Sequence, residues 1–321
     1  TFENYCSVLL MSFNYEKGKP YPILDKWLLI NMLGAGATAE VYLGFDPINK
    51  KHAAIKIFKS SDYKSLAEAR REAQIQCLLK HPLIINVETF YESATLTDID
   101  GKTRTVEAMV LELAKGGDLL LLVKSVDAVP EKLARTYFRQ IIEVLEYLHR
   151  KKIAHRDIKL ENFTLDGDFC IKLADFGCST SFAADKRVTS LVGTSKYFAP
   201  EMHLNKAYDM QAADLFAAAV VLFCLVCGNM PFKRSEDKDY LYDLIMKGKM
   251  DLFWRTHEEI AKKKSLLLKV SPEFKSLMNR MFDPDPQKRL SIEKIKSHAW
   301  YQQSVYEASE VKDIVQELIK Q

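Results

Sequence analysis

The run His155-Arg156-Asp157-Ile158-Lys159-Leu160-Glu161-Asn162 is the most informative part of this sequence. It sets an aspartate, a lysine and an asparagine at short fixed intervals. Two tripeptides follow it in order, Asp175-Phe176-Gly177 and Ala199-Pro200-Glu201. Any one of these charged residues, taken alone, is most simply a solvated surface group. That explanation is remote for the ordered set.

A glycine-containing loop lies upstream, at Gly34-Ala35-Gly36-Ala37-Thr38-Ala39-Glu40-Val41. A dinucleotide-binding loop would run straight into a helix and have an acidic residue about 20 positions later. Here the loop runs into a β-prone segment, and that later position falls in Ala53-Ala54-Ile55-Lys56-Ile57. A strand–loop–strand unit followed by Ala-x-Lys favours a hairpin that covers phosphates. Without the downstream motifs, a plain β-hairpin turn would be the simpler interpretation.

Short β-prone runs separated by turn residues begin at Trp27. They are Leu28–Ile30, Val41–Leu43, His52–Phe58, Val87–Tyr91 and Thr105–Leu113. Ser65 and Glu68 form a capping box, which predicts a helix from Ser65 to Leu79. Asp100-Gly101 lies in a polar hairpin between the last two runs. The sequence therefore predicts a small five-stranded antiparallel sheet with one helix.

The periodicity changes after Gly116-Gly117. Apolar residues then recur every three or four positions, which predicts one buried helix face: Leu133, Tyr137, Ile141, Leu145 and Leu148. Short strands are expected near 162–174 and helices over 208–319. The predicted fold class is α+β and bilobal. Its parts are a leader (1–26), a β-rich N-terminal lobe (27–113), a larger, mainly helical lobe (114–300) and a helical tail (301–321).

The composition is that of an ordinary globular protein. Its 46 Lys and Arg and 43 Asp and Glu give a net charge of +3, which excludes a strongly basic nucleic-acid binder and an acidic disordered chain. Six cysteines in 321 residues are too few for a disulfide scaffold and indicate reduced thiols. The longest apolar run, Leu215–Cys227, is too short to cross a bilayer and predicts a buried helix. Within that run, Cys224 and Cys227 suggest buried thiols more than a zinc site. We expect a cytoplasmic monomer, with a nuclear location open and with no nucleic-acid or membrane partner.

The four ordered motifs resemble those of the eukaryotic protein kinase family, from about Trp27 to Trp300. Lys159 is typical of the serine/threonine kinases, and the motif style is most similar to the calmodulin-dependent and AMP-activated group. The resemblance implies transfer of the γ-phosphate of ATP, with Mg²⁺, to Ser or Thr hydroxyls of protein substrates. A pseudokinase or scaffold that binds partner proteins is the alternative. A dinucleotide-dependent oxidoreductase rests on the glycine loop alone.

The resemblance also implies roles for particular residues. Asp157 would accept or orient the proton of the acceptor hydroxyl, and Lys159 would face the γ-phosphate. Asn162 and Asp175 would be the two magnesium ligands. Lys56 would bind the α- and β-phosphates, held by a carboxylate. The family match places the following residues at the nucleotide, including that carboxylate: Leu33, Gly34, Ala35, Gly36, Val41, Ala54, Glu72, Leu111 (the gatekeeper), Glu112, Ala114 and Asp118.

By the same resemblance, Ser190 occupies the main activating phosphosite, and Thr189 is the alternative. A phosphate there would pair with Arg156 and order the loop, which implies an upstream activating kinase. An unmodified polar loop remains the simpler interpretation of these residues by themselves. Thr194 is expected to support Asp157 and Lys159.

Further matches are structural. Asp214 corresponds to a buried residue that anchors the catalytic loop, and Arg289 corresponds to the partner of Glu201. The segment Val305–Gln321 is an amphipathic helix. A helix packed on the larger lobe is its simpler interpretation, with an autoinhibitory or partner-binding segment as the alternative.

Three departures from the family pattern bear on function. Gln76 replaces an apolar residue one turn after Glu72. A buried Gln is costly unless it finds a partner, so we expect this helix to dock weakly and the unphosphorylated protein to be poorly active. Thr164 stands where Leu is common beneath the adenine, so nucleotide affinity could differ from that of the family. Asp118 and Glu161 are carboxylates near where a peptide substrate would lie, which predicts a basic residue upstream of the acceptor. Cys224 replaces the second acid of the family's pocket for basic residues, so we expect one such residue and not two.

Overall fold

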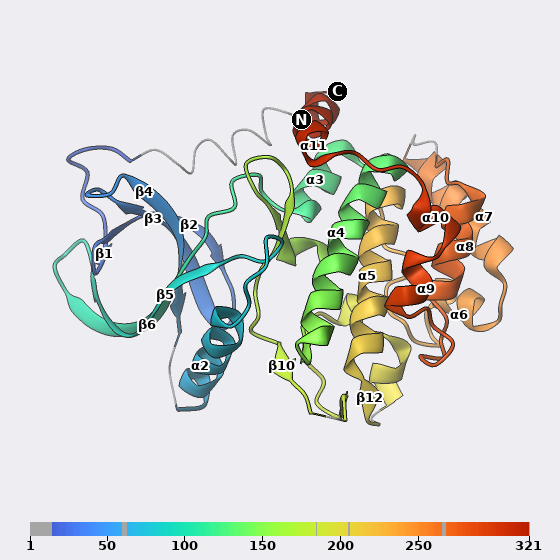
Figure 1. Cartoon of the computed structure of the whole chain (residues 1–321), viewed down its shortest axis with the longest axis horizontal. Coiled ribbons are helices and arrows are strands. Elements are labelled where there is room, and N and C mark those ends of the chain that lie inside the picture. The colour runs from blue at the N-terminus through green and yellow to red at the C-terminus, as the bar shows by residue number, and fades with distance from the viewer. Residues whose placement is uncertain (1–14, 60–62, 184, 205, 265–267, 321) are drawn as a thin grey trace. The chain divides into compact units, whose positions relative to one another are not determined.

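The computed structural model describes residues 15–59, 63–183, 185–204, 206–264 and 268–320 (Figure 1). The chain divides into two compact units. The first unit runs to Gly117 and also includes Thr164–Gly167 and Lys172–Gly177. The second unit contains Asp118–Phe163, Asp168–Ile171 and the chain from Cys178 onward.

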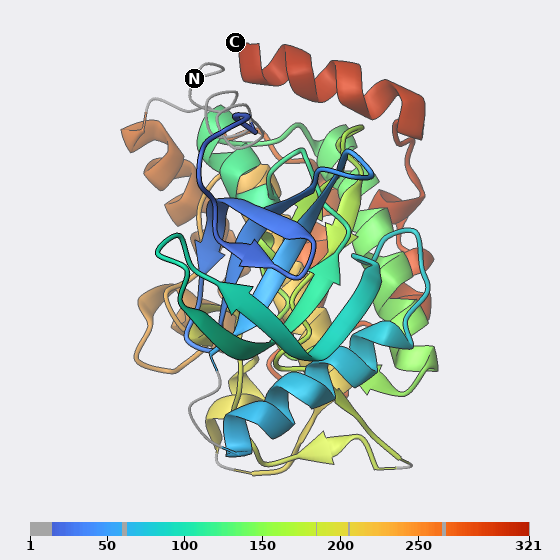
Figure 2. The same cartoon turned by 90° about the vertical axis from the view of Figure 1, so that its left-hand side faces the viewer.

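Antiparallel strands and one long helix make up the first unit. They are β1 (Ile23–Leu24), β2 (Trp27–Ala35), β3 (Ala39–Asp46), β4 (Lys51–Phe58), α2 (Tyr63–Cys77), β5 (Val87–Thr97) and β6 (Thr103–Leu111). The strand order is β1-β2-β3-β4-β6-β5, and the pairing of β1 with β5 closes a barrel. Figure 2 shows the strands curving round, with α2 along one side.

The barrel corrects the predicted five-stranded sheet, and β1 corrects the irregular leader at Ile23–Leu24; residues 1–14 of that leader lie outside the described residues. Ile23 lies opposite Leu28 of β2 and opposite Thr97 of β5, so β1 bridges both edges of the sheet. A two-residue strand is too short to leave a periodic pattern in the sequence. The expected hairpin is confirmed, with Gly101 at φ 81° between β5 and β6.

The start of α2 also differs from the prediction. The helix begins at Tyr63, two residues before Ser65, and ends at Cys77. Ser65 therefore lies within the first turn rather than at the N-cap, and the capping-box prediction is wrong. Ser and Glu three positions apart also occur inside helices, so the pattern alone does not fix a boundary.

Alternation along the strands places side chains on two faces. Ile55 and Ile57 of β4 join Trp27 in the core of the barrel. Phe58 belongs to a second cluster, which packs on Ala69 and Ala73 of α2. Lys56, between the two isoleucines, therefore lies on the α2 side of the sheet.

The second unit is mainly helical. Its helices are α3 (Leu119–Val126), α4 (Glu131–Arg150), α5 (Met210–Cys227), α6 (Tyr240–Met246), α7 (Met250–Lys263), α8 (Pro272–Met281), α9 (Ile292–Lys296), α10 (Ala299–Gln302) and α11 (Ala308–Lys320). Short strands pair as β7 (Ile153–Ala154) with β10 (Thr180–Ser181) and as β11 (Arg187–Val188) with β12 (Tyr208–Asp209). Both units contribute to the hairpin of β8 (Phe163–Leu165) and β9 (Ile171–Leu173).

Helix α5 forms the centre of the second unit. Asp209 caps it by accepting hydrogen bonds from the backbone of Gln211 (2.9 Å) and Ala212 (3.3 Å), and Gly228 ends it at φ 66°. The helix has 18 residues and is long and apolar enough to cross a membrane, but 89% of it is buried inside the protein. The core helix of a globular protein can have the same length and composition. The prediction of a buried helix over Leu215–Cys227 is confirmed.

The predicted buried face of α4 is also confirmed, because all five periodic residues are buried. The tail helix α11 buries Val311, Val315 and Ile319 and packs against α3. The segment before α11 is fixed to α4. Arg139 donates to the carbonyl of Tyr301 at 2.7 Å. The simpler interpretation of the tail, a helix packed on the larger lobe, is therefore confirmed.

His257 of α7 makes the stability of the protein depend on pH. Burial lowers its pKa to about 4, against the effect of its hydrogen bond with the carbonyl of Pro231. Between pH 6.5 and pH 4 the unfolded chain binds a proton at this site that the folded chain does not. We therefore expect the free energy of unfolding to fall by about 3 kcal/mol as the pH drops through this window.

Urea unfolding of wild type and His257→Gln, from pH 7 to pH 4, tests this expectation. Gln keeps a donor for the Pro231 carbonyl but does not titrate. The variant should lose less stability on acidification than wild type, and equal losses would contradict the assignment.

Candidate active site

A buried ion pair lies on the α2 face of the first unit. The Nζ of Lys56 donates to the carboxylate of Glu72 at 2.5 Å and to that of Asp175 at 3.0 Å. Lys56 and Glu72 are 7% and 3% exposed. Burial acts to lower the pKa of Lys56, but the charges of Glu72 and Asp175 outweigh it and raise that pKa. The ammonium group is therefore held charged at a fixed position. The choice of Glu72 as its partner is confirmed.

The segment after β9 brings Asp175 to this ion pair. Phe176 is fully buried. A Cβ added at Gly177 would lie 3.3 Å from a carboxylate oxygen of Glu72 and 3.4 Å from one of Asp175. A larger residue here would press on the Glu72 carboxylate that holds Lys56, and glycine avoids this contact.

Gln76 has a partner, contrary to the reasoning behind weak docking of α2. It is 1% exposed, and its Nε2 donates to the carbonyl of Ile85 at 3.1 Å. The amide thus fastens α2 to the chain that leads into β5, one turn from Glu72. The desolvation cost that motivated the prediction is offset by this hydrogen bond.

We expect Gln76→Ala to lower the free energy of unfolding by about 2 kcal/mol, because it leaves a buried carbonyl without a donor and a void beside it. Phosphotransfer should fall with it, since α2 positions Glu72. Gln74→Ala, an exposed residue of the same helix, is the matched control. An unchanged urea midpoint for Gln76→Ala would show that the hydrogen bond does not fasten the helix.

The glycine loop joins β2 to β3, as the strand–loop–strand interpretation predicts. The backbone N–H of Gly36 donates to the carbonyl of Ala39 at 2.8 Å. Val41 lies opposite Gly34 on one side and Lys56 on the other. The dinucleotide-binding alternative is wrong, because no helix follows the loop. Leu33, Gly34, Ala35 and Gly36 are exposed at the hairpin end.

The hinge residues, Leu111, Glu112 and Ala114, lie at the end of β6 and directly after it. Leu111 is opposite Ala54 and is 9% exposed. The Glu112 carboxylate accepts from the backbone of Asn86 (3.1 Å) and pairs with Lys172 (2.7 Å). Ala114 is half-buried two residues further on. The adenine contacts expected of this segment stay a prediction.

Thr164 and Asp118 make polar contacts of their own. The Thr164 hydroxyl donates to the carbonyl of Lys172 at 2.8 Å. In the second unit, Asp118 is the N-cap of α3 and accepts from the backbone of Leu121 at 2.8 Å. Burial raises the pKa of Asp118, opposed by this hydrogen bond. Its expected contact with ribose stays a prediction.

The catalytic-loop residues converge on Asp157 in the second unit. Its carboxylate accepts from Nζ of Lys159 at 2.6 Å and from the backbone of Thr194 at 2.8 Å. Asn162 Nδ2 donates to the Asp157 carbonyl at 2.8 Å. Lys159 also donates to the Thr194 hydroxyl at 3.1 Å. The expectation that Thr194 supports Asp157 and Lys159 is confirmed.

Asp214 of α5 holds the backbone of this loop. Its carboxylate accepts from the backbone of His155 (3.0 Å) and Arg156 (2.8 Å) and contacts Nε2 of His149 at 3.0 Å. Arg156 has φ 66°, and a Cβ at Gly193 would lie 2.3 Å from its carbonyl. The anchoring role of Asp214 is confirmed.

Arg156 connects the catalytic loop (residues 155–162) to the activation segment, which runs from residue 175 to residue 201. Its Nη1 donates to the Ser190 hydroxyl at 3.0 Å, and its Nε donates to the Cys178 carbonyl at 2.8 Å. Tyr208 donates to the Ser190 carbonyl at 2.9 Å. The sequence does not indicate this role of Tyr208, because a single tyrosine before a helix carries no signal of such a contact. The exposed Thr189 follows β11.

Two further expectations for the second unit are met. Arg289 donates to both carboxylate oxygens of Glu201, at 2.7 and 2.9 Å. Cys224 and Cys227 are buried free thiols in α5, and burial raises the pKa of each. Within the residues that the structure describes, no group of three or more His, Cys, Asp or Glu could hold a metal ion.

Comparison with known proteins agrees with this geometry. Residues 27–301 match the model of the protein kinase domain family. The human SNF-related serine/threonine-protein kinase is 32% identical over 292 residues, which cover 90% of this chain and 35% of the relative. CBL-interacting protein kinase 24 from Oryza sativa subsp. japonica is 32% identical over 279 residues, 85% of this chain and 55% of the relative.

The chain therefore belongs to the eukaryotic protein kinase family, serine/threonine type. CBL-interacting serine/threonine-protein kinase 16 from Arabidopsis thaliana, 30% identical over 297 residues, covers 88% of the chain. The chain spans between 35% and 58% of the length of these three curated relatives. The resemblance to the calmodulin-dependent and AMP-activated group is confirmed by these relatives.

Proposed function

We propose that this protein transfers the γ-phosphate of ATP to Ser or Thr hydroxyls of protein substrates. The observation that carries the proposal is the Asp157 carboxylate, held by Lys159 and by the backbone of Thr194 at hydrogen-bond distance. A carboxylate fixed in this way can accept the proton of an acceptor hydroxyl. Phosphoryl transfer otherwise depends on positioning and charge neutralisation, for which Lys56 and Lys159 supply ammonium groups.

We assign nucleotide-phosphate binding to the first unit and activation of the hydroxyl to the second. Lys56 binds phosphate oxygens, and Glu72 keeps its ammonium group in position. Lys159 neutralises the transferred group, and Asp157 takes the hydroxyl proton. The remaining hairpin and hinge residues of the family match cover and orient the nucleotide.

Mg²⁺ suits the donors that the family match assigns to it. The Nδ2 of Asn162 donates a hydrogen bond to the Asp157 carbonyl. The Oδ1 of the same amide is therefore the atom that would coordinate a cation. Asp175 supplies a carboxylate whose side chain is 49% exposed. Amide and carboxylate oxygens are ligands that magnesium prefers. When bound, the ion would neutralise charge on the phosphates.

Phosphorylation of Ser190 is the proposed control. Its hydroxyl already lies 3.0 Å from Nη1 of Arg156, so a phosphate here would form a charge-assisted hydrogen bond with the guanidinium. Thr189 is the alternative site, and an upstream kinase would supply the phosphate. The CBL-interacting relatives are named for a partner protein, and we propose that a regulatory protein also binds this kinase. We propose a cytoplasmic monomer.

The substrates proposed are peptides with one basic residue upstream of the acceptor. Glu161 is the acid assigned to it, and its Oε2 accepts a long hydrogen bond of 3.4 Å from Tyr197. Cys224, which replaces a second acid, is buried and contacts Met230. On arrayed peptides we expect Glu161→Gln to reduce the preference for Arg over Ala about tenfold. An acidic or proline-directed preference in wild type would contradict the assignment.

ATP turnover onto a mixed set of basic Ser and Thr peptides with magnesium tests the proposed activity. The protein should be assayed before and after treatment with an activating kinase. Dependence on that treatment, lost in Ser190→Ala, supports the proposed control. Absence of transfer in every condition, with ATP still bound, would favour the scaffold alternative.

A further inference from the structure

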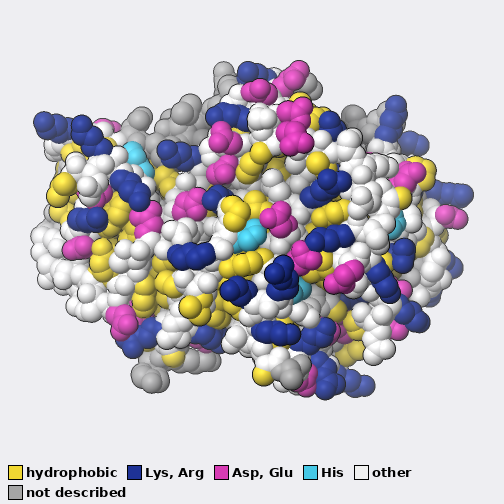
Figure 3. All heavy atoms as spheres, viewed as in Figure 1, with side chains coloured by type: hydrophobic (Ala, Val, Ile, Leu, Met, Phe, Trp, Pro, Cys, Tyr) yellow, Lys and Arg dark blue, Asp and Glu magenta, His cyan; other side chains and the backbone are white. Residues whose placement is uncertain are grey.

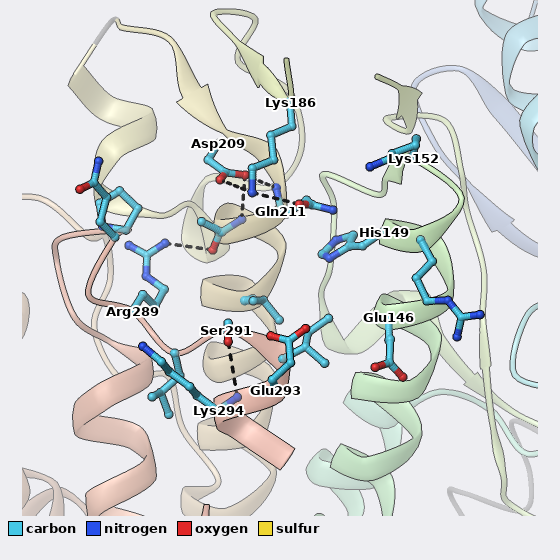
Figure 4. Close-up of a pocket in the computed structure, with 17 residues that line it drawn as sticks. Glu146, His149, Lys152, Lys186, Asp209, Gln211, Arg289, Ser291, Glu293 and Lys294 are labelled. Atoms are coloured by element: carbon cyan, nitrogen blue, oxygen red, sulfur yellow. Dashed lines mark hydrogen bonds and ion pairs between the residues drawn. The ribbon is translucent and has the colours of Figure 1, made fainter. Parts of the chain in front are cut away.

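A cavity of about 530 Å³ lies in the second unit, away from the residues assigned to phosphoryl transfer. Its walls come from the end of α4, the first turns of α5 and the chain from Pro286 into α9. Figure 4 shows His149 and Lys152 extending toward it from the α4 side, with Ser291 and Glu293 on the opposite side. Its volume is in the range of sites that bind ligands or peptide side chains. Asp157, Lys159 and Asn162 do not line it.

The charges that line the cavity are unequally compensated. Lys186 pairs with Asp209 at 2.7 Å. Arg289 is neutralised by Glu201, as described above. Glu146 pairs with Lys296 at 2.6 Å. These pairs leave the local charge balanced.

Three lining cations remain. Arg150, Lys152 and Lys294 are exposed, and within the described parts of the chain no ion pair or hydrogen bond engages their side chains. The remaining acid is Glu293, whose pKa is lowered mainly by a hydrogen bond with Ser291. Three uncompensated positive charges against one negative charge make the cavity favourable for anionic groups.

The arrangement of these cations distinguishes an extended anion from a compact one. Arg150 and Lys152 flank the end of α4, whereas Lys294 belongs to α9 on the opposite wall (Figure 4). A phosphate ion would need donors that converge on one point. Between the charged groups the lining is partly apolar, with Leu215, Leu290 and others. Separated charges around an apolar floor suit a chain of alternating acidic and aliphatic side chains.

We infer that this cavity binds an acidic peptide segment of a partner protein, whose carboxylates pair with Arg150, Lys152 and Lys294 while its aliphatic side chains occupy the floor. The site lies apart from the proposed catalytic residues, so binding can be measured whether or not the protein transfers phosphate. Glu161, which is assigned to basic substrates, does not line the cavity. Partner binding and substrate binding thus use surfaces of opposite charge.

Fluorescence anisotropy with a labelled peptide of repeated Glu-Leu-Glu is the direct test, with Gln-Leu-Gln as the neutral probe. We expect wild type to bind the acidic peptide at least tenfold more tightly than the neutral one. Arg150→Glu/Lys152→Glu should weaken binding of the acidic peptide at least tenfold, and Lys294→Glu should weaken it several-fold. Raising the salt concentration should weaken binding to wild type, because the charges are exposed.

The matched control is Lys262→Glu/Lys263→Glu, at exposed positions of α7, with the same change in net charge. It should bind like wild type. Equal weakening in the control would show attraction by net charge alone and overturn the site. Equal affinity for acidic and neutral peptides would overturn it as well. Full displacement of the peptide by inorganic phosphate at constant ionic strength would indicate a compact-anion site and contradict the inference. Unchanged thermal unfolding of the variants establishes that they are folded.

Discussion

Asp157→Asn should lower the rate of phosphotransfer about a thousandfold, the scale of a lost general base. Asn has nearly the same shape and still accepts the backbone N–H of Thr194. It cannot take a proton, however, and it removes the negative charge that holds Lys159 at 2.6 Å. Nucleotide affinity should change little, because Asp157 is not among the residues assigned to ATP. Steady-state turnover and a fluorescent-nucleotide titration separate the two effects.

Asp237→Asn, an exposed residue before α6, is the charge-matched control and should keep wild-type turnover. If Asp157→Asn retained more than a tenth of the wild-type rate, this carboxylate would not be the proton acceptor. Loss of both turnover and nucleotide binding would point to a folding defect and not to catalysis.

Lys56→Met should abolish measurable turnover and destabilise the protein by about 3 kcal/mol. The substitution leaves the carboxylate of Glu72, which is 3% exposed, without its counter-charge and beside Asp175. Removing one partner of a buried ion pair is strongly destabilising, because the other charge stays buried. Nucleotide titration should show weakened ATP binding, and urea unfolding should show a lower midpoint.

The double variant Lys56→Met/Glu72→Leu completes the test. Replacing both charges with apolar side chains should recover most of the stability but none of the turnover. Lys59→Met is the control, because Lys59 pairs with Glu40 near the surface and should contribute less than about 1 kcal/mol. A double variant no more stable than Lys56→Met would contradict the buried-charge explanation.

The basic and acidic side chains on the face shown in Figure 3 are interspersed. This distribution agrees with a net charge of +3, and the composition alone therefore does not locate a site. The inferred peptide site depends instead on which cations lack a counter-charge. The pairing of Lys186 with Asp209 and of Lys296 with Glu146 removes other candidates.

The sequence by itself determined the local features of this protein. The β-prone run His52–Phe58 predicts the strand that contains Lys56, and the period near 3.6 predicts the buried face of α4. The family resemblance carried by the ordered motifs implied the catalytic loop and the pairing of Lys56 with Glu72. The inferences from periodicity succeed because strand and helix periodicity is a property of neighbouring residues.

Only the tertiary structure decided the long-range contacts. The two residues of β1 close the barrel by meeting β5, more than 70 positions later in the chain. Gln76 is satisfied by the carbonyl of Ile85, and Tyr208 meets the carbonyl of Ser190. The cavity beside Lys152 exists because segments far apart in the sequence come together. Every residue has a backbone carbonyl, so the sequence does not show which carbonyl a side chain will reach. The distance between remote segments depends on how the elements pack, and no local pattern in the sequence reports it.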